Sequence, residues 1–324
     1  MRNLLYIIVI SLATLACFAT GESEAISRLR LLAREGDAEA MYRLSYLLET
    51  GKGGVPVDSL RADSLLRASA EKGYAPACNL LGYRYYDLAP DTMLMWITRA
   101  ATAPQPDPKA FNNLGYLLST GSGGVKKDMK KALYWYGRGA EAGVPAAMAS
   151  LAGLLLDGRE VPADSLLALS LLRGAAAKGF RPAAERLYLI VSHNLDSLSA
   201  DDALEQGLDY YNERIFPVSA PFFMRAAKAD NPYALALLAQ SYAEGLGVPY
   251  DYGHAMHLFW HAAILGDPSA AYIVGETLQQ FPDAFLEETM SDPLARTPEE
   301  WLRQAASLGV TDAHRAITRL QPTK

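Results

Sequence analysis

The chain is poor in cysteine, because its 324 residues include only Cys17 and Cys78. Cys17 lies in an apolar N-terminal stretch, so the remainder of the chain has a single thiol. It therefore cannot form the internal disulfide framework that stabilises many small exported domains. Half of the residues are apolar, which is enough for a packed core. We expect the fold to depend on side-chain packing, with Cys78 as a buried structural thiol.

The sequence also lacks a surplus of positive charge. Its formal net charge is -6 and its pI is about 5.5, and its lysines and arginines are scattered along the chain. Proteins that bind nucleic acid usually gather basic residues on one face. We therefore expect no nucleic-acid partner.

Only the N-terminus holds an apolar run that suggests a targeting segment. Arg2 precedes this run, which extends from Leu4 to Ala16 and is followed by small and polar residues. The layout is typical of a secretory signal peptide, and the run is short for a membrane span. We predict a signal peptide over residues 1–21, with an uncleaved anchor as the alternative.

Cys17 offers a second route of processing. The residues Thr14-Leu15-Ala16-Cys17 resemble a lipoprotein box, although threonine stands where that box prefers leucine. Cys17 is therefore a candidate lipidation site. Both routes predict an exported protein that is periplasmic, attached to the outer membrane or secreted. Membrane contact would then be limited to the signal peptide or a lipid anchor.

Two short blocks alternate along the rest of the chain. The first, ETGKGGVPVD at 49–58, recurs as STGSGGVKKD at 119–128 and in shorter versions at 155–164 and 243–252. The second is a pair of small residues followed by two residues and a glycine. That glycine recurs at Gly73, Gly143, Gly179, Gly266 and Gly309. Their spacing gives a repeating unit of about 36 residues.

Each unit is predicted to be a helix, a glycine turn and a second helix. Apolar residues between the blocks fall at helical spacing, as in Leu114, Leu117 and Leu118. The glycines suit left-handed conformations, and an aspartate such as Asp58 or Asp128 stands where it can cap the second helix. The predicted units are 37–73, 74–104, 108–143, 145–179, 182–230, 231–266 and 268–309, flanked by a capping helix at 22–36 and by a capping helix and tail at 311–324.

These residues resemble the Sel-one-like repeat family, whose units are short relatives of the tetratricopeptide repeat. The resemblance implies an all-α fold, a right-handed α/α solenoid of about seven repeats spanning residues 37–310. It also implies a protein-binding scaffold with no catalytic activity and no cofactor. The shared pattern is clearest in the third unit, at Ala110, Leu114-Gly115, Gly121, Gly123-Gly124-Val125, Asp128, Ala132, Trp135, Gly139-Ala140 and Gly143.

The first helix of such a pair usually lines the concave side. Counted from the unit's alanine, offsets one, four and eight are mostly apolar or small and belong to the core, whereas offsets two, six and nine share another face. Tyrosine and asparagine there predict a groove for a protein or an extended peptide. The alternative is that the tyrosines pack between units with their hydroxyls in water. The predicted groove residues are Tyr42, Tyr46, Glu49, Asn79, Tyr83, Tyr86, Asn112, Tyr116 and Ser119.

Three other patterns resemble sites that carry chemistry. His254, His257 and His261 share a helical face and could bind zinc or copper. Residues 69–72, Ser-Ala-Glu-Lys, match the S-x-x-K motif of penicillin-binding enzymes, but they coincide with a repeat block and no K-T-G triad accompanies them. The glycines of 49–58 lack the residue order of a phosphate loop. A weak hydrolase of the penicillin-binding type or a metal-binding envelope protein is the alternative to a scaffold.

Overall fold

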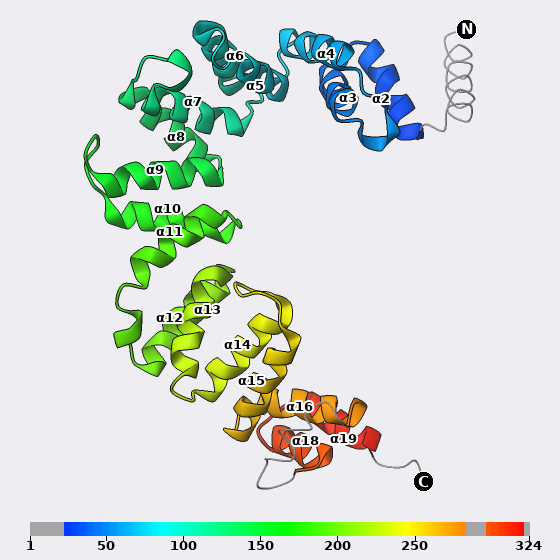
Figure 1. Cartoon of the computed structure of the whole chain (residues 1–324), viewed down its shortest axis with the longest axis vertical. Coiled ribbons are helices and arrows are strands. Elements are labelled where there is room, and N and C mark those ends of the chain that lie inside the picture. The colour runs from blue at the N-terminus through cyan, green and yellow to red at the C-terminus, as the bar shows by residue number, and fades with distance from the viewer. Residues whose placement is uncertain (1–22, 283–295, 321–324) are drawn as a thin grey trace. The chain divides into compact units, whose positions relative to one another are not determined.

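The computed structural model describes residues 23–282 and 296–320. Over these residues the chain forms 17 α-helices, three short 3-10 helices and no strand (Figure 1). The predicted all-α fold is confirmed. The predicted signal peptide and Cys17 lie outside the described residues. No described helix combines the length and the apolar character needed to cross a bilayer.

The helices belong to two compact units, Met1–Leu171 and Leu172–Lys324, whose boundary falls within α10 (Ser165–Ala177). In the first unit α3 packs on α4, α5 on α6 and α7 on α8, and the second helix of each pair packs on the next first helix. The remaining helices of this unit are α2 (Glu24–Arg34), α3 (Ala38–Thr50), α4 (Ser59–Glu71), α5 (Ala75–Arg84), α6 (Pro90–Thr102), α7 (Pro108–Thr120), α8 (Met129–Glu141) and α9 (Pro145–Asp157).

The second unit is also built mainly of helix pairs. Helix α12 packs on α13, α14 on α15, and α16 on α18, while α19 packs on α18. Its helices after α10 are α11 (Arg181–Val191), α12 (Ala200–Asn212), α13 (Phe216–Ala227), α14 (Pro232–Glu244), α15 (Tyr252–Ile264), α16 (Pro268–Gln280), α18 (Pro298–Ser307) and α19 (Thr311–Leu320).

The glycine-rich stretch at 49–58 is the turn between α3 and α4. Gly51 ends α3 in the left-handed conformation, with φ 69°, and Lys52–Gly54 form a 3-10 helix. The Asp58 carboxylate then accepts a hydrogen bond of 3.0 Å from the Arg61 amide and caps α4. Gly121 and Asp128 repeat this arrangement between α7 and α8. Its prediction as a turn is confirmed.

A small residue inside each first helix lets the second helix approach closely. On α7, a Cβ added to Gly115 would lie 2.5 Å from the Tyr136 ring of α8, and Tyr136 is buried. Gly82 on α5 faces Ile97 of α6 in the same way. This contact therefore fixes the distance between the two helices of a pair. It also fixes which face of the first helix points away from the second helix.

Gly115→Ala is expected to lower the free energy of unfolding by about 1–3 kcal/mol, because the new methyl group overlaps a buried ring. Gly137→Ala is the matched control on α8, since a Cβ there meets nothing within 4 Å. It is expected to raise stability by about 0.5–1 kcal/mol through helix propensity. Urea unfolding of both variants checks the pair, and equal effects would contradict the packing described.

The predicted fifth unit, 182–230, is wrong in its helix composition. It contains three helices, of which α12 and α13 form the tight pair and α11 is an additional helix packed on α13. Gly207 of α12 lies against the Phe223 ring of α13, as Gly115 lies against Tyr136. The turn between α12 and α13 contains no glycine, and Arg214 takes the left-handed conformation there with φ 63°. The sequence therefore lacks, at this turn, the glycine that marks the turn in other repeats.

Candidate binding face on the first helices

Three exposed tyrosines stand at offset six of α3, α5 and α7 in the first unit. The exposed fractions of Tyr46, Tyr83 and Tyr116 are 43%, 40% and 46%, which is high for aromatic side chains. The Tyr46 hydroxyl accepts a 2.5 Å hydrogen bond from Lys52 Nζ, which also lies 5.0 Å from the ring centroid. We call Tyr46, Tyr83 and Tyr116 the tyrosine row.

The row continues into a local cluster of phenols. Partial burial raises the pKa of Tyr83, and the neighbouring phenols of Tyr86, Tyr116 and Tyr136 raise it further. The Tyr83 hydroxyl therefore stays protonated at neutral pH and can donate as well as accept hydrogen bonds. The exposed rings of Tyr83 and Tyr116 give this part of the surface an aromatic character with polar tips.

The residues at offset two do not form a free row, which corrects the prediction for Asn79. Asn79 is buried, its Nδ2 donates to Asp107 Oδ2 at 2.7 Å, and its Oδ1 accepts from Asn113 Nδ2 at 2.9 Å. Tyr42 packs on Tyr74, with ring centroids 5.5 Å apart. These side chains join successive repeats, so they are not available to a peptide backbone.

Asn112, also at offset two, is half-buried, and its Oδ1 accepts a weak 3.4 Å hydrogen bond from Ser150. It therefore contacts the next repeat through α9.

The residues at offset nine also have partners within the protein. Glu49 pairs with Arg84 of α5 in the next repeat at 2.7 Å, whereas Ser119 Oγ lies 3.2 Å from the Tyr136 hydroxyl of its own repeat. Tyr86 lies outside the predicted helix because α5 ends at Arg84, and its ring packs near Gly123 in the next glycine turn. Of the nine predicted groove residues, the tyrosine row is the part that combines exposure with a shared face.

The three histidines of α15 do not converge on one point. His254 makes an edge contact with Tyr242, and His261 Nε2 lies 3.4 Å from Asp230 Oδ1. His257 is exposed on the same helix. Within residues 23–282 and 296–320, no three His, Cys, Asp or Glu side chains are grouped so that they could hold a metal ion.

Ser69 and Cys78 are both buried among packed helices. The Ser69 hydroxyl donates a 2.5 Å hydrogen bond to the Ala38 carbonyl and is fully buried, so a substrate cannot reach it. Cys78 Sγ lies 3.3 Å from the Ala70 carbonyl, and burial raises the pKa of its thiol. The S-x-x-K match is thus a contact between helices, and the prediction of a buried Cys78 is confirmed.

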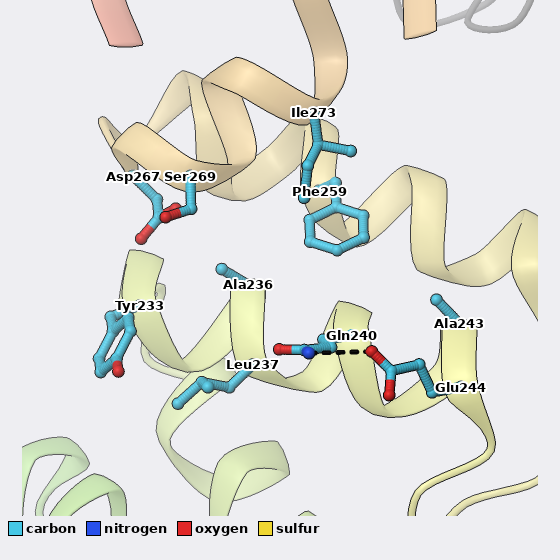
Figure 2. A pocket seen from close by; sticks show the side chains of 10 residues that line it. All are labelled: Tyr233, Ala236, Leu237, Gln240, Ala243, Glu244, Phe259, Asp267, Ser269 and Ile273. Atoms are coloured by element: carbon cyan, nitrogen blue, oxygen red, sulfur yellow. Dashed lines mark hydrogen bonds between the residues drawn. The ribbon is translucent and has the colours of Figure 1, made fainter. Parts of the chain in front are cut away.

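A cleft of about 440 Å³ lies on the same helix face in the second unit (Figure 2). Ala236, Gln240 and Ala243 of α14, which occupy offsets two, six and nine, form one side. Ile273 of α16 and the buried Phe259 of α15 form much of the rest. The complete lining is Tyr233, Ala236, Leu237, Gln240, Ala243, Glu244, Phe259, Asp267, Ser269 and Ile273.

Carboxylates stand at both ends of this cleft. Figure 2 shows Asp267 beside the Tyr233 end of α14 and Glu244 at the opposite end, where it accepts a 2.9 Å hydrogen bond from Gln240. Asp267 caps α16 by accepting from the Ala270 amide at 2.8 Å and is only 5% exposed. Among the described lining residues there is no lysine, arginine or histidine. The cleft is therefore apolar in its middle and acidic at its ends.

Burial raises the pKa of the Asp267 carboxyl, although the Ala270 and Ser269 amides oppose the shift. Ionised Asp267 therefore costs stability, and wild type is expected to lose stability relative to Asp267→Asn as pH rises from about 4 through the raised pKa. Asparagine keeps the helix cap. Urea unfolding across this pH range measures the difference. A difference between wild type and Asp267→Asn that stays constant, or that changes in favour of wild type as pH rises, would contradict the assignment.

Comparison with known proteins identifies the repeats. The sequence model described as Sel1 repeat matches residues 38–74, 75–89, 108–144, 145–180, 232–267 and 299–310, which together make up just over half of the chain. The chain belongs to the Sel1 repeat family. This confirms the resemblance drawn from the glycine turns and the small-residue pairs. Sel1 repeats generally mediate protein–protein interactions, and the proteins built from them are typically scaffolds without catalytic activity.

Individual Sel1 relatives are distant. An uncharacterized protein of Neisseria meningitidis is 26% identical over 255 residues, which is 78% of this chain and 48% of the relative. This chain thus spans about half of that protein's length.

Two crystal structures of similar proteins have TM-scores below 0.5. A protective antigen of uropathogenic Escherichia coli with an SLR fold is 27% identical, with a TM-score of 0.48 and coverage of 91% of this chain and 59% of that one. A Sel1 repeat protein of Oxalobacter formigenes is 24% identical, with a TM-score of 0.41 and coverage of 94% and 92%.

The sequence predicts the helix face on which the cleft lies but not the cleft itself. The prediction for offsets two, six and nine rests on tyrosine and asparagine, whereas in the Sel1 repeat at 232–267 two of these positions are alanine. Small residues open a cleft where their counterparts in the first three repeats are mostly larger. The sequence feature that indicates the cleft is therefore the change from large to small side chains at equivalent positions.

Proposed function

We propose that this protein is an exported scaffold that binds another protein, or an extended peptide, along the face of its first helices that carries the offset-six residues and, in the second unit, also the offset-two and offset-nine residues of the cleft. We call this surface the first-helix face. Membership of the Sel1 repeat family supports the general role. The observation that carries the proposal is that both units have features suited to binding at these same positions. The first has the tyrosine row and the second has the acid-ended cleft.

The tyrosine row suits protein recognition for physical reasons. A tyrosine offers a large rigid surface and one polar tip while losing little conformational entropy on binding. Because the row is already exposed, binding needs no prior opening of the repeats. Tyrosine is also enriched among residues that dominate interface energies.

Export is proposed from the N-terminal sequence. The charged start, the apolar run and the small residues at Ala19-Thr20-Gly21 favour a signal peptide, and Cys17 favours lipid attachment as the alternative. Radiolabelled palmitate incorporation, compared between wild type and Cys17→Ala, distinguishes the two routes. Label that depends on Cys17 would support a lipid-anchored form, and absence of label would count against lipid attachment.

The binding proposal is tested by capture from the envelope fraction with a face variant and a matched control. Simultaneous alanine substitution of Tyr46, Tyr83 and Tyr116 is expected to weaken recovery of a specific partner at least about tenfold. The control replaces Tyr134, Tyr250 and Tyr252, which are more exposed than the tyrosine row but lie outside the first-helix face. It is expected to recover the partner as wild type does, provided that both variants unfold at the wild-type temperature.

Two outcomes would count against the proposal. Unchanged recovery by the folded tyrosine-row variant would exclude this face of the first unit as the binding surface. Equal loss in the control variant would show that recovery depends on exposed tyrosine in general rather than on the first-helix face.

A further inference from the structure

We infer that the cleft between α14 and α16 binds an extended partner segment that carries two cationic side chains four residues apart, with an aliphatic residue midway. This inference rests on the proposed function and names the chemistry of the partner at one part of the first-helix face. Three features of the cleft support the inference: its apolar middle, its acidic ends and its length.

The middle of the cleft suits an aliphatic side chain. Ala236 and Ala243 leave room above the helix, and Phe259 and Ile273 provide apolar surface between them (Figure 2). Its volume of about 440 Å³ falls in the range of pockets that enclose ligands. At offset two, the first three repeats carry Tyr42, Asn79 and Asn112 in place of Ala236. Ala236 is thus smaller than its counterparts in those three repeats, although the repeat at 145–180 also has an alanine, Ala149, at offset two.

The ends of the cleft suit cations. Glu244 is exposed at one end, where it accepts a hydrogen bond from the neutral Gln240. Asp267 is buried at the other end and is bonded to backbone amides. No cationic side chain is found in the described lining, so a carboxylate at each end lacks a lining cation. Lysine or arginine of a partner can lay its aliphatic stem on the apolar floor and extend its charged group to either end.

The length of the cleft gives the spacing. Tyr233 and Glu244 mark its two ends on α14 and are 11 positions apart, or about 16 Å along the helix axis. An extended chain rises about 3.3 Å per residue, so residues four apart are separated by about 13 Å and point to the same side. The two cationic side chains are long enough to span the difference between these two lengths. The residue midway also points to that side and meets the apolar floor.

The test selects ligands without assuming their sequence. The full chain is immobilised and panned against phage that display random heptapeptides, at low and at high salt. Wild type is expected to enrich lysine or arginine at two positions four apart, with an aliphatic residue between them. The enrichment is expected to weaken at high salt, because exposed charge pairs are screened.

Three variants locate the binding. Glu244→Gln and Asp267→Asn keep the local hydrogen-bonding groups, and each is expected to remove the preference at one cationic position and to weaken the selected peptide about threefold to fivefold. Ala236→Tyr restores the residue type of the first repeat and is expected to reduce recovery about tenfold by filling the cleft. Glu205→Gln is the control, since Glu205 is an exposed carboxylate on α12 outside the cleft.

The outcomes separate this inference from the proposed function. Enriched peptides without cationic preference, still lost on Ala236→Tyr, would overturn the charge assignment and leave peptide binding intact. Cationic preference that survives in both charge variants would place the peptide elsewhere and overturn the inference. Absence of enrichment on every variant would count against both. Displacement of the peptides by spermidine at a lower concentration than unlabelled peptide requires would identify a free polyamine as the occupant instead.

Discussion

Gly247→Ala is expected to lower the free energy of unfolding by about 3 kcal/mol or more, or to prevent folding of the second unit. Gly247 lies between α14 and α15 with φ 75°, a conformation that strains any residue with a side chain. A Cβ there would also overlap the Phe216 carbonyl group at the start of α13 and lie 2.8 Å from Pro217 N. Backbone atoms cannot move aside as a flexible side chain can, so strain and overlap add.

Gly54→Ala separates these two causes. Gly54 has nearly the same φ, 74°, but a Cβ there meets nothing within 4 Å. It is expected to cost only about 1 kcal/mol, from conformation alone. Chemical denaturation followed by circular dichroism measures both. Equal losses would show that the close approach of Gly247 to α13 contributes nothing.

Trp301→Ala is expected to cost about 3–5 kcal/mol, the usual range for removing a fully buried tryptophan. Trp301 is 0% exposed on α18 and packs edge-on against Trp260 of α15, with centroids 5.4 Å apart. The guanidinium of Arg296 lies 4.2 Å from the ring centroid. Because α18 packs on α16, losing this ring would also loosen the helix that provides Asp267, Ser269 and Ile273 to the cleft.

Trp301→Phe is the control for this prediction. Among the described residues, Trp301 Nε1 is a buried donor without a hydrogen-bond partner. Phenylalanine removes this unsatisfied group while keeping most of the apolar volume, so its cost is expected to be below about 1.5 kcal/mol. A loss as large as that of alanine, measured by urea unfolding, would mean that the indole group itself is required.

The repeats were predictable because their signals are local. Gly51 and Asp58 lie within one turn, and each contributes through its own backbone or the next few residues. The α12–α13 pair was mistaken because Arg214 does at its turn what glycine does elsewhere. The sequence does not reveal that an arginine adopts the left-handed conformation. The packing of Gly207 on Phe223 was therefore needed to recognise the pair.

The candidate site was predictable only as a helix face. Helical spacing placed Tyr46 and its counterparts together, but it could not show that Asn79 bonds Asp107, which is 28 residues away. Nor could it show that alanines in α14 open a cleft, because this depends on what α16 and Phe259 place opposite. Side-chain direction follows from the helix, whereas the partners of each side chain depend on how neighbouring repeats pack.

Site-specific photocrosslinking tests the central claim, that partners bind on the first-helix face. A photoreactive phenylalanine analogue is placed at Tyr116 on α7 or at Tyr134 on α8, whose exposed fractions are 46% and 54%. After irradiation in the envelope fraction, the account predicts a discrete crosslinked partner from position 116 and none from position 134. Crosslinking that is equal at both positions, or stronger at 134, would contradict it.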